Sequence, residues 1–462
     1  MKLRSYQVPH ADKLLAIIRE RRVAHDGSDT GTGKSFCAAF IAKQLALDTL
    51  VICPLSVVPM WRAVLADAGV TATVINYESA WRRLGQKVKC GRGFFFQFAK
   101  AYPFVIYDEA HRTGGETTIN SKMVIASKRA GSRILTLSAT AADSVFTIKA
   151  LGFAIGLHGL SNYREWLMSH GAKEVPIYGR GGRPVLRKDG QPATKLDIGK
   201  RANTEAMQVL HEQIFGSGNR GSRMRIADIP DFPMTQIEVR LLDGADKELD
   251  RLSDELQTYI KQRNALGQFS DEILAKLVFW RQAAETAKIP HFIDMAEDAL
   301  ETSKVAVFVN FNRTVDELVD ECVKHGWKVG VIRGDQHPVD RQFTIEQFQG
   351  NVLDVIVCNI QAGGVGVSLH DPFTKYPRTA LFSPCWSAKD LKQGFGRVHR
   401  DDGGVSRQFL LYWSTGIEAR VAGSVRRKLD NLALLNDQEL DGSFSEPDDQ
   451  TLAATAQRAL SL

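Results

Sequence analysis

A glycine-rich loop that leads directly into an apolar segment is the most constraining stretch of this sequence. Residues 28–35 read Ser-Asp-Thr-Gly-Thr-Gly-Lys-Ser, and residues 36–42 have the composition of a helix. The glycines allow a tight turn whose N–H groups point inward, the lysine supplies a cation, and the last serine supplies a hydroxyl for Mg²⁺. The strict pattern has glycine where Ser28 stands. The loop predicts a nucleotide phosphate cradle made by Thr30, Gly31, Thr32, Gly33, Lys34 and Ser35.

Gln7 lies just upstream of this loop, ahead of a short helical pattern. Its amide can both donate and accept hydrogen bonds, which suits recognition of an adenine edge. A lone glutamine is usually a surface residue, so a nucleotide contact and a surface position both stay open.

Two adjacent carboxylates follow a short apolar run at 104–107. Similar runs at 50–53 and 74–77 have the form of buried parallel strands. Metal-assisted phosphoryl transfer requires carboxylates in this position, downstream of a phosphate loop. We therefore expect Asp108 to hold Mg²⁺ and Glu109 to orient and deprotonate the attacking water.

A further strand at 134–137 runs into Ser138 and Thr140. Small hydroxyl residues at the carboxyl end of a strand can hydrogen-bond neighbouring loops, which suits a relay between two sites. Strands and helices alternate through residues 22–150, so the sequence predicts an α/β domain with a parallel sheet.

Length and composition predict a globular chain of two to three domains. The 462 residues are 44% hydrophobic and 24% charged. The six cysteines are scattered without a C-x-x-C pair, which argues against zinc and against a disulfide framework. Without a signal-like or membrane-length apolar run, we expect a cytoplasmic protein, or a nuclear one if the source is eukaryotic.

The formal net charge of +6 is compatible with a polyanionic partner. Basic residues crowd one Gly/Pro-containing stretch, where a solvated loop and a nucleic-acid contact are equally plausible. The basic residues assigned to a nucleic-acid contact there are Arg180, Arg183, Arg187 and Lys188.

The ordered set of motifs resembles the superfamily 2 helicases and translocases. The upstream glutamine, the phosphate loop, Asp-Glu-Ala-His at 108–111 and Ser-Ala-Thr at 138–140 are followed by further blocks. The blocks at 362–369 and 393–400 resemble the Swi/Snf-type ATPases in particular, and the compact layout is similar to their annealing-helicase branch. The resemblance covers about residues 1–430 and implies ATP and Mg²⁺ as cofactors. It also implies an α/β fold of two RecA-like parallel-sheet lobes with a mainly helical insertion between them.

The same resemblance implies a role for the second lobe in hydrolysis. Arg397 and Arg400 would act as arginine fingers, with Gln393 beside them, because a guanidinium can neutralise charge that develops on the γ-phosphate. Gly364 and Gly366 would contact the nucleotide. The strand-end loops would contact nucleic-acid phosphates through Pro54, Ser56, Asn76, Tyr77, Asn310, Arg333, Gly334 and Gly363.

Two departures put the branch of the family in doubt. After Arg400, Swi/Snf-type proteins continue Ile-Gly-Gln, whereas this chain has Asp-Asp-Gly at 401–403. After His111 they have a basic residue near a Lys-Asn pair, whereas this chain has Arg-Thr-Gly-Gly at 112–115.

The domain division expected from these patterns has four parts. They are a first lobe at 1–150, a helical and basic insertion at 151–285, a second lobe at 286–430 and a tail at 431–462. The tail is rich in Asp, Glu, Gly and Ser and is expected to fray.

The sequence interpretation is a nucleic-acid-stimulated ATPase that translocates on duplex or branched DNA, as a monomer without a membrane partner. RNA is the less favoured substrate. The alternatives are a strand-separating DNA or RNA helicase, and a motor subunit of a restriction or remodelling assembly whose protein partner is unknown.

Overall fold

The computed structural model describes most of the chain as two compact units. The first comprises Met1–Ala172 and Ile198–Phe232, and the second comprises Lys173–Asp197 and the described residues between Pro233 and Glu418. The described residues are 1–91, 93–115, 117–139, 142, 144–177, 183–187, 190–233, 235–242, 247–265, 271–360, 367–385, 387–414 and 418.

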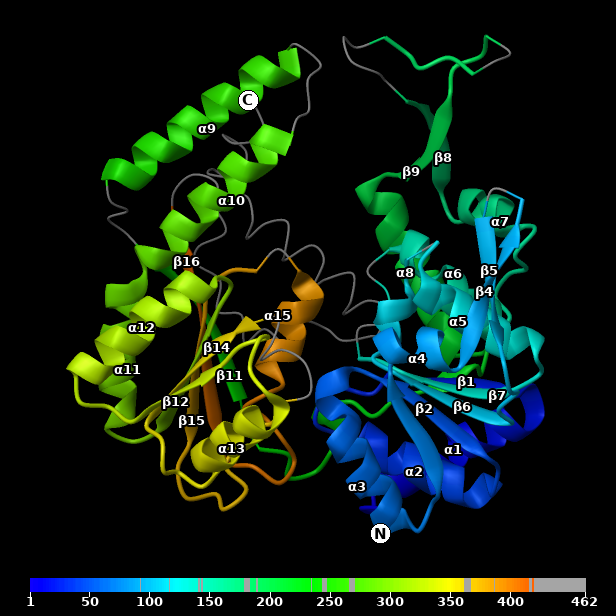
Figure 1. Cartoon of the computed structure of the whole chain (residues 1–462), viewed down its shortest axis with the longest axis horizontal. Helices are drawn as coiled ribbons and strands as arrows, with labels where there is room; N and C mark the ends of the chain where they lie inside the picture. The colour runs from blue at the N-terminus through cyan, green and yellow to red at the C-terminus, as the bar shows by residue number, and fades with distance from the viewer. Residues whose placement is uncertain are drawn as a thin grey trace. The chain divides into compact units, whose positions relative to one another are not determined.

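The first unit is built on a six-stranded parallel sheet in the order β10-β1-β7-β6-β2-β3 (Figure 1). Both faces are covered by helices, so the inner strands β1, β7, β6 and β2 are nearly continuous buried runs, whereas the edge strand β3 is only partly buried. The strands are β1 Val23–Asp26, β2 Thr49–Cys53, β3 Ala72–Asn76, β6 Phe104–Asp108, β7 Arg133–Leu137 and β10 Gly221–Ser222.

Helices α1, α2 and α3 lie on one face of this sheet, and α5 and α6 lie on the other (Figure 1). Apolar residues of α1, α2 and α3 form one core with β1, β2, β6 and β7. The α-helices are α1 Gln7–Arg21, α2 Lys34–Leu45, α3 Val58–Ala68, α4 Tyr77–Arg83, α5 Ile119–Arg129, α6 Lys149–Ile155, α7 Tyr163–Ser169 and α8 Lys200–Phe215. The 3₁₀ turns are η1 Leu55–Val57, η2 Ala110–Thr113, η3 Val145–Thr147 and η4 Ile226–Asp228.

The second unit has a six-stranded parallel sheet in the order β11-β16-β15-β12-β14-β13. Its core forms where α11 and α12 pack on β12, β14 and β15. The strands are β11 Thr235–Leu242, β12 Lys304–Val309, β13 Val329–Ile332, β14 Val355–Asn359, β15 Arg378–Phe382 and β16 Ser406–Trp413. The helices are α9 Lys247–Ala265, α10 Asp271–Thr286, α11 Ile289–Leu300, α12 Asn312–Lys324, α13 Pro338–Gln349 and α15 Ala388–Phe395.

Two short two-stranded sheets complete the strands of the described chain. One is the antiparallel hairpin of β4 Gly85–Cys90 and β5 Gly93–Phe98, and the other pairs β8 Ala172–Pro176 with β9 Thr194–Ile198. Within the described residues, no helix is both long and apolar enough to cross a membrane.

The fold-class prediction of two parallel-sheet lobes with helices is confirmed. The domain boundaries stay a prediction, although the stretch 151–285 does more than form helices. It supplies β10 to the first sheet and β11 to the second, so the segment expected as an insertion contributes one strand to each lobe.

Candidate functional site

The phosphate loop has the geometry that the glycine spacing predicts. Gly31 and Gly33 both have φ of 90°, a left-handed conformation that a side chain disfavours, and α2 begins directly afterwards at Lys34. A Cβ atom added to Gly33 would lie 2.1 Å from Nε2 of Gln7. The loop therefore presents the N-terminus of α2, where backbone N–H groups can bind an anion.

Gln7 contacts the loop itself. Its Nε2 donates to Thr32 O at 3.0 Å, and its Oε1 accepts from the backbone N–H of Arg4 at 3.0 Å. The side chain is buried. Gln7 thus holds the turn that carries Gly33, and its contact with an adenine stays a prediction.

Lys34 lies along the loop that it follows in sequence. Its Nζ donates to the carbonyl oxygens of Ser28 at 2.8 Å and Asp29 at 2.9 Å. The Thr32 hydroxyl also donates to Asp29 O, at 2.9 Å, and its side chain is fully buried. Thr30 and Ser35 are half-buried, so a hydroxyl remains accessible at the start of α2.

Residues 220–226, here called the bracing segment, run parallel to the strand that enters the phosphate loop. Backbone N–H groups at 25, 27 and 29 donate to carbonyl oxygens at 220, 222 and 224, each at 3.0 Å. In return Met224 N donates to the Ser28 hydroxyl at 2.8 Å, and Ile226 N donates to the Asp29 carboxylate at 3.0 Å. Ser28, the departure from the strict glycine pattern, is therefore the side chain that ties the loop to this segment.

A buried polar network lies next to the hydrogen bonds between the phosphate loop and the bracing segment. His10 is 3.1 Å from the Asp26 carboxylate, and its other ring nitrogen is 3.0 Å from the Ser222 hydroxyl. Asp26 also accepts the backbone N–H of Ser28 at 2.9 Å. Burial by itself would raise the pKa of Asp26, but His10, Lys34 and Ser28 outweigh it and lower the pKa to about 2. The carboxylate is thus ionised at neutral pH and fixes the base of the loop.

Replacing Ser28 with Ala is expected to weaken ATP binding more than it slows turnover. The change leaves the buried N–H of Met224 without its acceptor, and such a loss costs about 1–3 kcal/mol. We expect KM for ATP to rise roughly tenfold, which corresponds to about 1.4 kcal/mol, with kcat within a factor of about three. Steady-state ATPase kinetics measure this. An unchanged KM in a fully folded variant would contradict the bracing role.

The outer side of the bracing segment borders a pocket of about 290 Å³. An aromatic ring and several basic side chains line it, next to the phosphate loop. These side chains are Tyr6, His10, Lys13, Arg223 and Arg225.

The carboxylates predicted for hydrolysis lie at the carboxyl end of β6. Trp61 Nε1 donates to Asp108 Oδ2 at 2.7 Å, and the backbone N–H of Glu109 donates to Oδ1 at 3.0 Å. Burial and the Glu109 carboxylate raise the pKa of Asp108 to about 6, although Trp61 and Lys34 oppose this shift.

Glu109 has φ of 51°, which is a strained conformation for a residue with a side chain. Its Oε2 lies 3.3 Å from His111 Nδ1, and the same nitrogen is 3.4 Å from the Ser138 hydroxyl. Ser138 N in turn donates to Asp26 O at 3.0 Å, at the base of the phosphate loop. The structure thus connects the predicted coupling residue Ser138 to Glu109 through His111. Thr140 lies outside the described residues.

The side chain of Tyr77 corrects one prediction. It was expected to contact nucleic acid, but it is fully buried and its hydroxyl donates to Asp108 O at 2.8 Å. Together with the fully buried Trp61, it supports the backbone and carboxylate of Asp108. Sequence reasoning missed both roles because apolar periodicity shows only that an aromatic ring is buried.

In the second unit, the three predicted catalytic residues gather at the end of α15. Gln393 and Arg397 are buried, and Arg400 is half-buried. Arg397 Nη1 donates to Val367 O at 3.3 Å, and Arg400 Nε donates to Ser368 Oγ at 3.1 Å. Both guanidinium groups are therefore held by the strand-end segment 367–369. Gly363, Gly364 and Gly366 lie outside the described residues.

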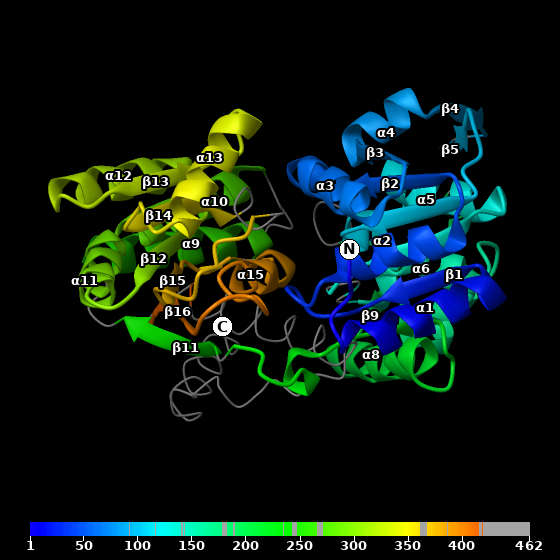
Figure 2. The ribbon, with the colours of Figure 1, turned by 90° about the horizontal axis from the view of Figure 1, so that it is seen from below.

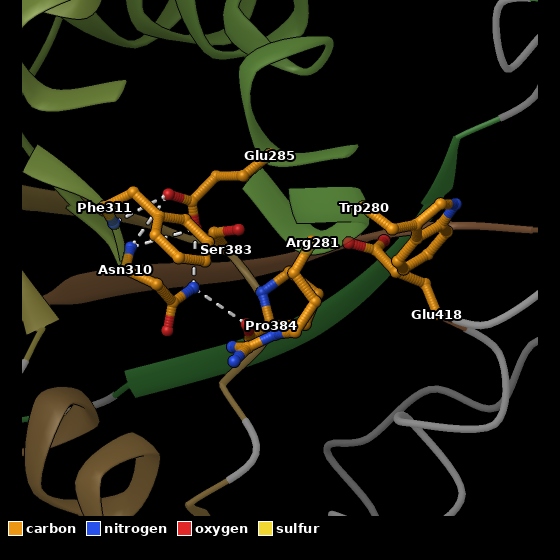
Figure 3. Close-up of a pocket in the computed structure, with 8 residues that line it drawn as sticks. All are labelled: Trp280, Arg281, Glu285, Asn310, Phe311, Ser383, Pro384 and Glu418. Atoms are coloured by element: carbon orange, nitrogen blue, oxygen red, sulfur yellow. Dashed lines mark hydrogen bonds between the residues drawn. The ribbon is translucent and has the colours of Figure 1, made fainter. Parts of the chain in front are cut away.

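A buried carboxylate organises the loop after β12 (Figure 3). Glu285 of α10 accepts the backbone N–H groups of Asn310 and Phe311 at 2.9–3.0 Å, and the Asn310 amide donates to it at 2.5 Å. That amide also donates to Pro384 O at 2.9 Å, after β15. Asn310, predicted to contact nucleic acid, therefore uses its side chain to join two strand ends. No local pattern marks Glu285, because a lone acid on a helix has no signature.

The remaining residues predicted to contact nucleic acid differ in their burial and in their interaction partners. Pro54 is buried, Ser56 is half-buried and Gly334 is exposed. Asn76 Nδ2 donates to Glu78 at 2.8 Å, and Arg333 forms an ion pair with Asp316. In the basic stretch, Arg183 and Arg187 are exposed, whereas Arg180 and Lys188 lie outside the described residues.

Comparisons with known proteins agree with these motifs. Residues 287–402 match the helicase conserved C-terminal domain. A protein of Acanthamoeba polyphaga mimivirus, named as an ATP-dependent RNA helicase, is 29% identical over 96% of this chain and 85% of its own length. Protein CHROMATIN REMODELING 24 of Arabidopsis thaliana is 26% identical over 28% of this chain and 11% of its own length. The Sulfolobus solfataricus SWI2/SNF2 ATPase core, solved with double-stranded DNA, aligns with 95% of this chain and 98% of that chain at 16% identity and a TM-score of 0.37.

Proposed function

We propose that this chain is an ATP-hydrolysing superfamily 2 helicase of the Swi/Snf-like type, and that it couples ATP hydrolysis to movement along double-stranded or branched DNA. The observation that carries the hydrolytic part is one connected arrangement in the first unit. Lys34 donates to the carbonyl oxygens of Ser28 and Asp29 in the phosphate loop, and Glu109 connects through His111 and Ser138 to the base of the same loop.

The roles in hydrolysis follow from this arrangement. The loop N–H groups and Lys34 would bind the phosphates of ATP, and the pocket lined by Tyr6 and Arg223 offers room for its base. Mg²⁺, when bound, would neutralise phosphate charge, and Ser35 and Asp108 are the residues suited to hold it. Glu109 would accept the proton of the attacking water. The 3.3 Å contact between its Oε2 and His111 Nδ1 fixes where that carboxylate points.

DNA is favoured as the track by the Swi/Snf-like character of the second unit. The glycine block and the Gln393 to Arg400 block carry that resemblance, and the plant relative is named for chromatin remodelling. We propose that the backbone is read by charge and shape, since phosphate contacts position a protein without specifying sequence. A monomer suffices for this activity.

A second candidate function is strand separation on RNA. The mimivirus relative, which matches nearly the whole chain, is named as an RNA helicase. A third candidate function is that of a motor subunit whose task is set by a protein partner. For each of these functions we propose the same domain boundaries, at about residues 150 and 285.

The ATPase rate with a panel of nucleic acids tests the proposal. Single-stranded, duplex and forked DNA and a matched RNA duplex are each added at saturation, with Lys34→Ala as the blank for contaminating activity. We expect duplex or forked DNA to stimulate hydrolysis at least about tenfold more than RNA, a difference of about 1.4 kcal/mol in the barrier. If RNA alone stimulates hydrolysis, movement along DNA is ruled out and the RNA helicase function is favoured.

A further inference from the structure

The antiparallel hairpin β4–β5 is an addition to the first unit that the parallel sheet does not require. It lies between α4 and β6 in sequence and packs on α4 and α5, at one edge of the unit (Figure 2). Its register pairs Lys87 with Phe96 and Lys89 with Phe94. Directly paired residues point to the same face of a hairpin, so this face mixes lysines with aromatic rings.

Two lysines of this surface lie against the same aromatic ring. Lys87 Nζ lies 4.4 Å from the ring centre of Trp81 and 5.1 Å from that of Phe94. Lys122 Nζ, from α5, lies 3.3 Å from the same Phe94 ring. We name Trp81, Lys87, Phe94 and Lys122 the hairpin patch. The rings orient the ammonium groups by cation–π attraction but leave their positive charge in place.

The charge of this surface is unbalanced. Between residues 77 and 98 the only acid is Glu78. Among the described residues, no carboxylate lies within ion-pair distance of Lys87 or Lys122, whose Nζ atoms contact aromatic rings. Desolvation and the positive charges of Lys87 and Lys149 lower the pKa of Lys122. An anion bound between the lysines would relieve this repulsion. The basic residues at 77–98 are Arg82, Arg83, Lys87, Lys89 and Arg92.

Glu78 links α4, the helix that carries Trp81, to the turn after β6. Glu78 pairs with Arg112 at 3.5 Å and accepts from Asn76 Nδ2 at 2.8 Å. Arg112 belongs to η2, the turn that also carries His111 next to Glu109. The hairpin packs on α4, and α4 pairs with the turn after β6 through Glu78 and Arg112. A ligand that shifts the hairpin would therefore also shift the helix that contacts this turn.

We propose that the hairpin patch is a contact for the phosphate backbone of the DNA on which this motor moves. The proposal rests on the proposed function and adds a site outside the strand-end loops. Lys87 and Lys122 bind phosphate oxygens, while Trp81 and Phe94 keep the two lysines from spreading apart. Because the contact reads charge alone, it strengthens binding to every DNA sequence alike.

The test measures DNA affinity of the full chain at several salt concentrations. In the Lys87→Gln/Lys122→Gln variant we expect the slope of log affinity against log salt to become shallower by roughly 1.8, since each lost phosphate contact removes about 0.9 for duplex DNA. The Lys87→Arg/Lys122→Arg variant keeps both charges and is expected to keep the wild-type slope. Basal ATPase without nucleic acid should match the wild type in both variants.

A charge-matched control separates contact from general attraction. Lys43→Gln/Lys324→Gln removes the same charge from two exposed lysines elsewhere and should change the slope by less than about 0.5, because distant charges act only through a screened field. If the patch variant behaves like this control while the wild type binds DNA, the patch is not a DNA contact. A wild-type chain that binds no DNA would instead defeat the proposed function itself.

Discussion

Replacing Glu109 with Gln is expected to leave ATP bound while hydrolysis falls by about 10²–10⁴-fold, the range for loss of a positioned general base. The substitution keeps the size of the side chain and removes its proton-accepting charge. Nucleotide affinity should persist because the proposed phosphate site is the loop with Lys34, whose contacts at Ser28 and Asp29 are untouched. Binding of a fluorescent ATP analogue and single-turnover hydrolysis separate the two effects.

Two companion variants sharpen this result. Lys34→Ala should lose affinity and turnover together, because the ammonium contacts the loop and is the cation proposed to bind the phosphates. Glu78→Gln changes an exposed acid near the same turn and is expected to retain basal turnover within a factor of about three. Wild-type turnover by the Glu109 variant would remove Glu109 from the role of general base.

Changing Arg397 and Arg400 to Lys is expected to lower the rate of hydrolysis by about 10³–10⁵-fold, the effect of removing an arginine finger. Lysine keeps the positive charge but lacks the planar fork of donors that a γ-phosphate requires. The backbone and hydroxyl contacts at Val367 and Ser368 hold these guanidinium groups in place within the second unit. ATP affinity should change far less than the rate, so the measurement is again single-turnover hydrolysis at saturating ATP.

Arg378 supplies a matched control for this pair. It is also a buried arginine of the second unit, but it donates to Leu369 O at 3.0 Å, Asn351 Oδ1 at 2.8 Å and Phe348 O at 3.1 Å. Arg378→Lys should therefore lower the thermal stability of the chain and leave turnover of the folded fraction intact. A Lys variant of Arg397 and Arg400 that hydrolyses ATP within a few-fold of wild type would rule out the finger role.

The two-lobe arrangement was expected from the resemblance to the superfamily 2 helicases. The sequence by itself determined the phosphate loop, the carboxylates after β6 and the parallel α/β form of the first lobe. These features are local. Glycine at 31 and 33 is required because the backbone is left-handed there, and a buried parallel strand must be a continuous apolar run. Carboxylates placed directly after such a run lie at the carboxyl edge of the sheet, where ligands bind in α/β folds.

Only the tertiary structure decided how this site is held together. Ser28 looked like a defect in the loop pattern, yet it accepts the N–H of Met224, 196 residues away in sequence. The strand β10 spans only Gly221–Ser222, too short for any periodic signal. Tyr77 and Glu285 likewise act through hydrogen bonds to backbone from other elements. Such bonds depend on which chain segments meet after folding, and neither residue type nor spacing encodes that.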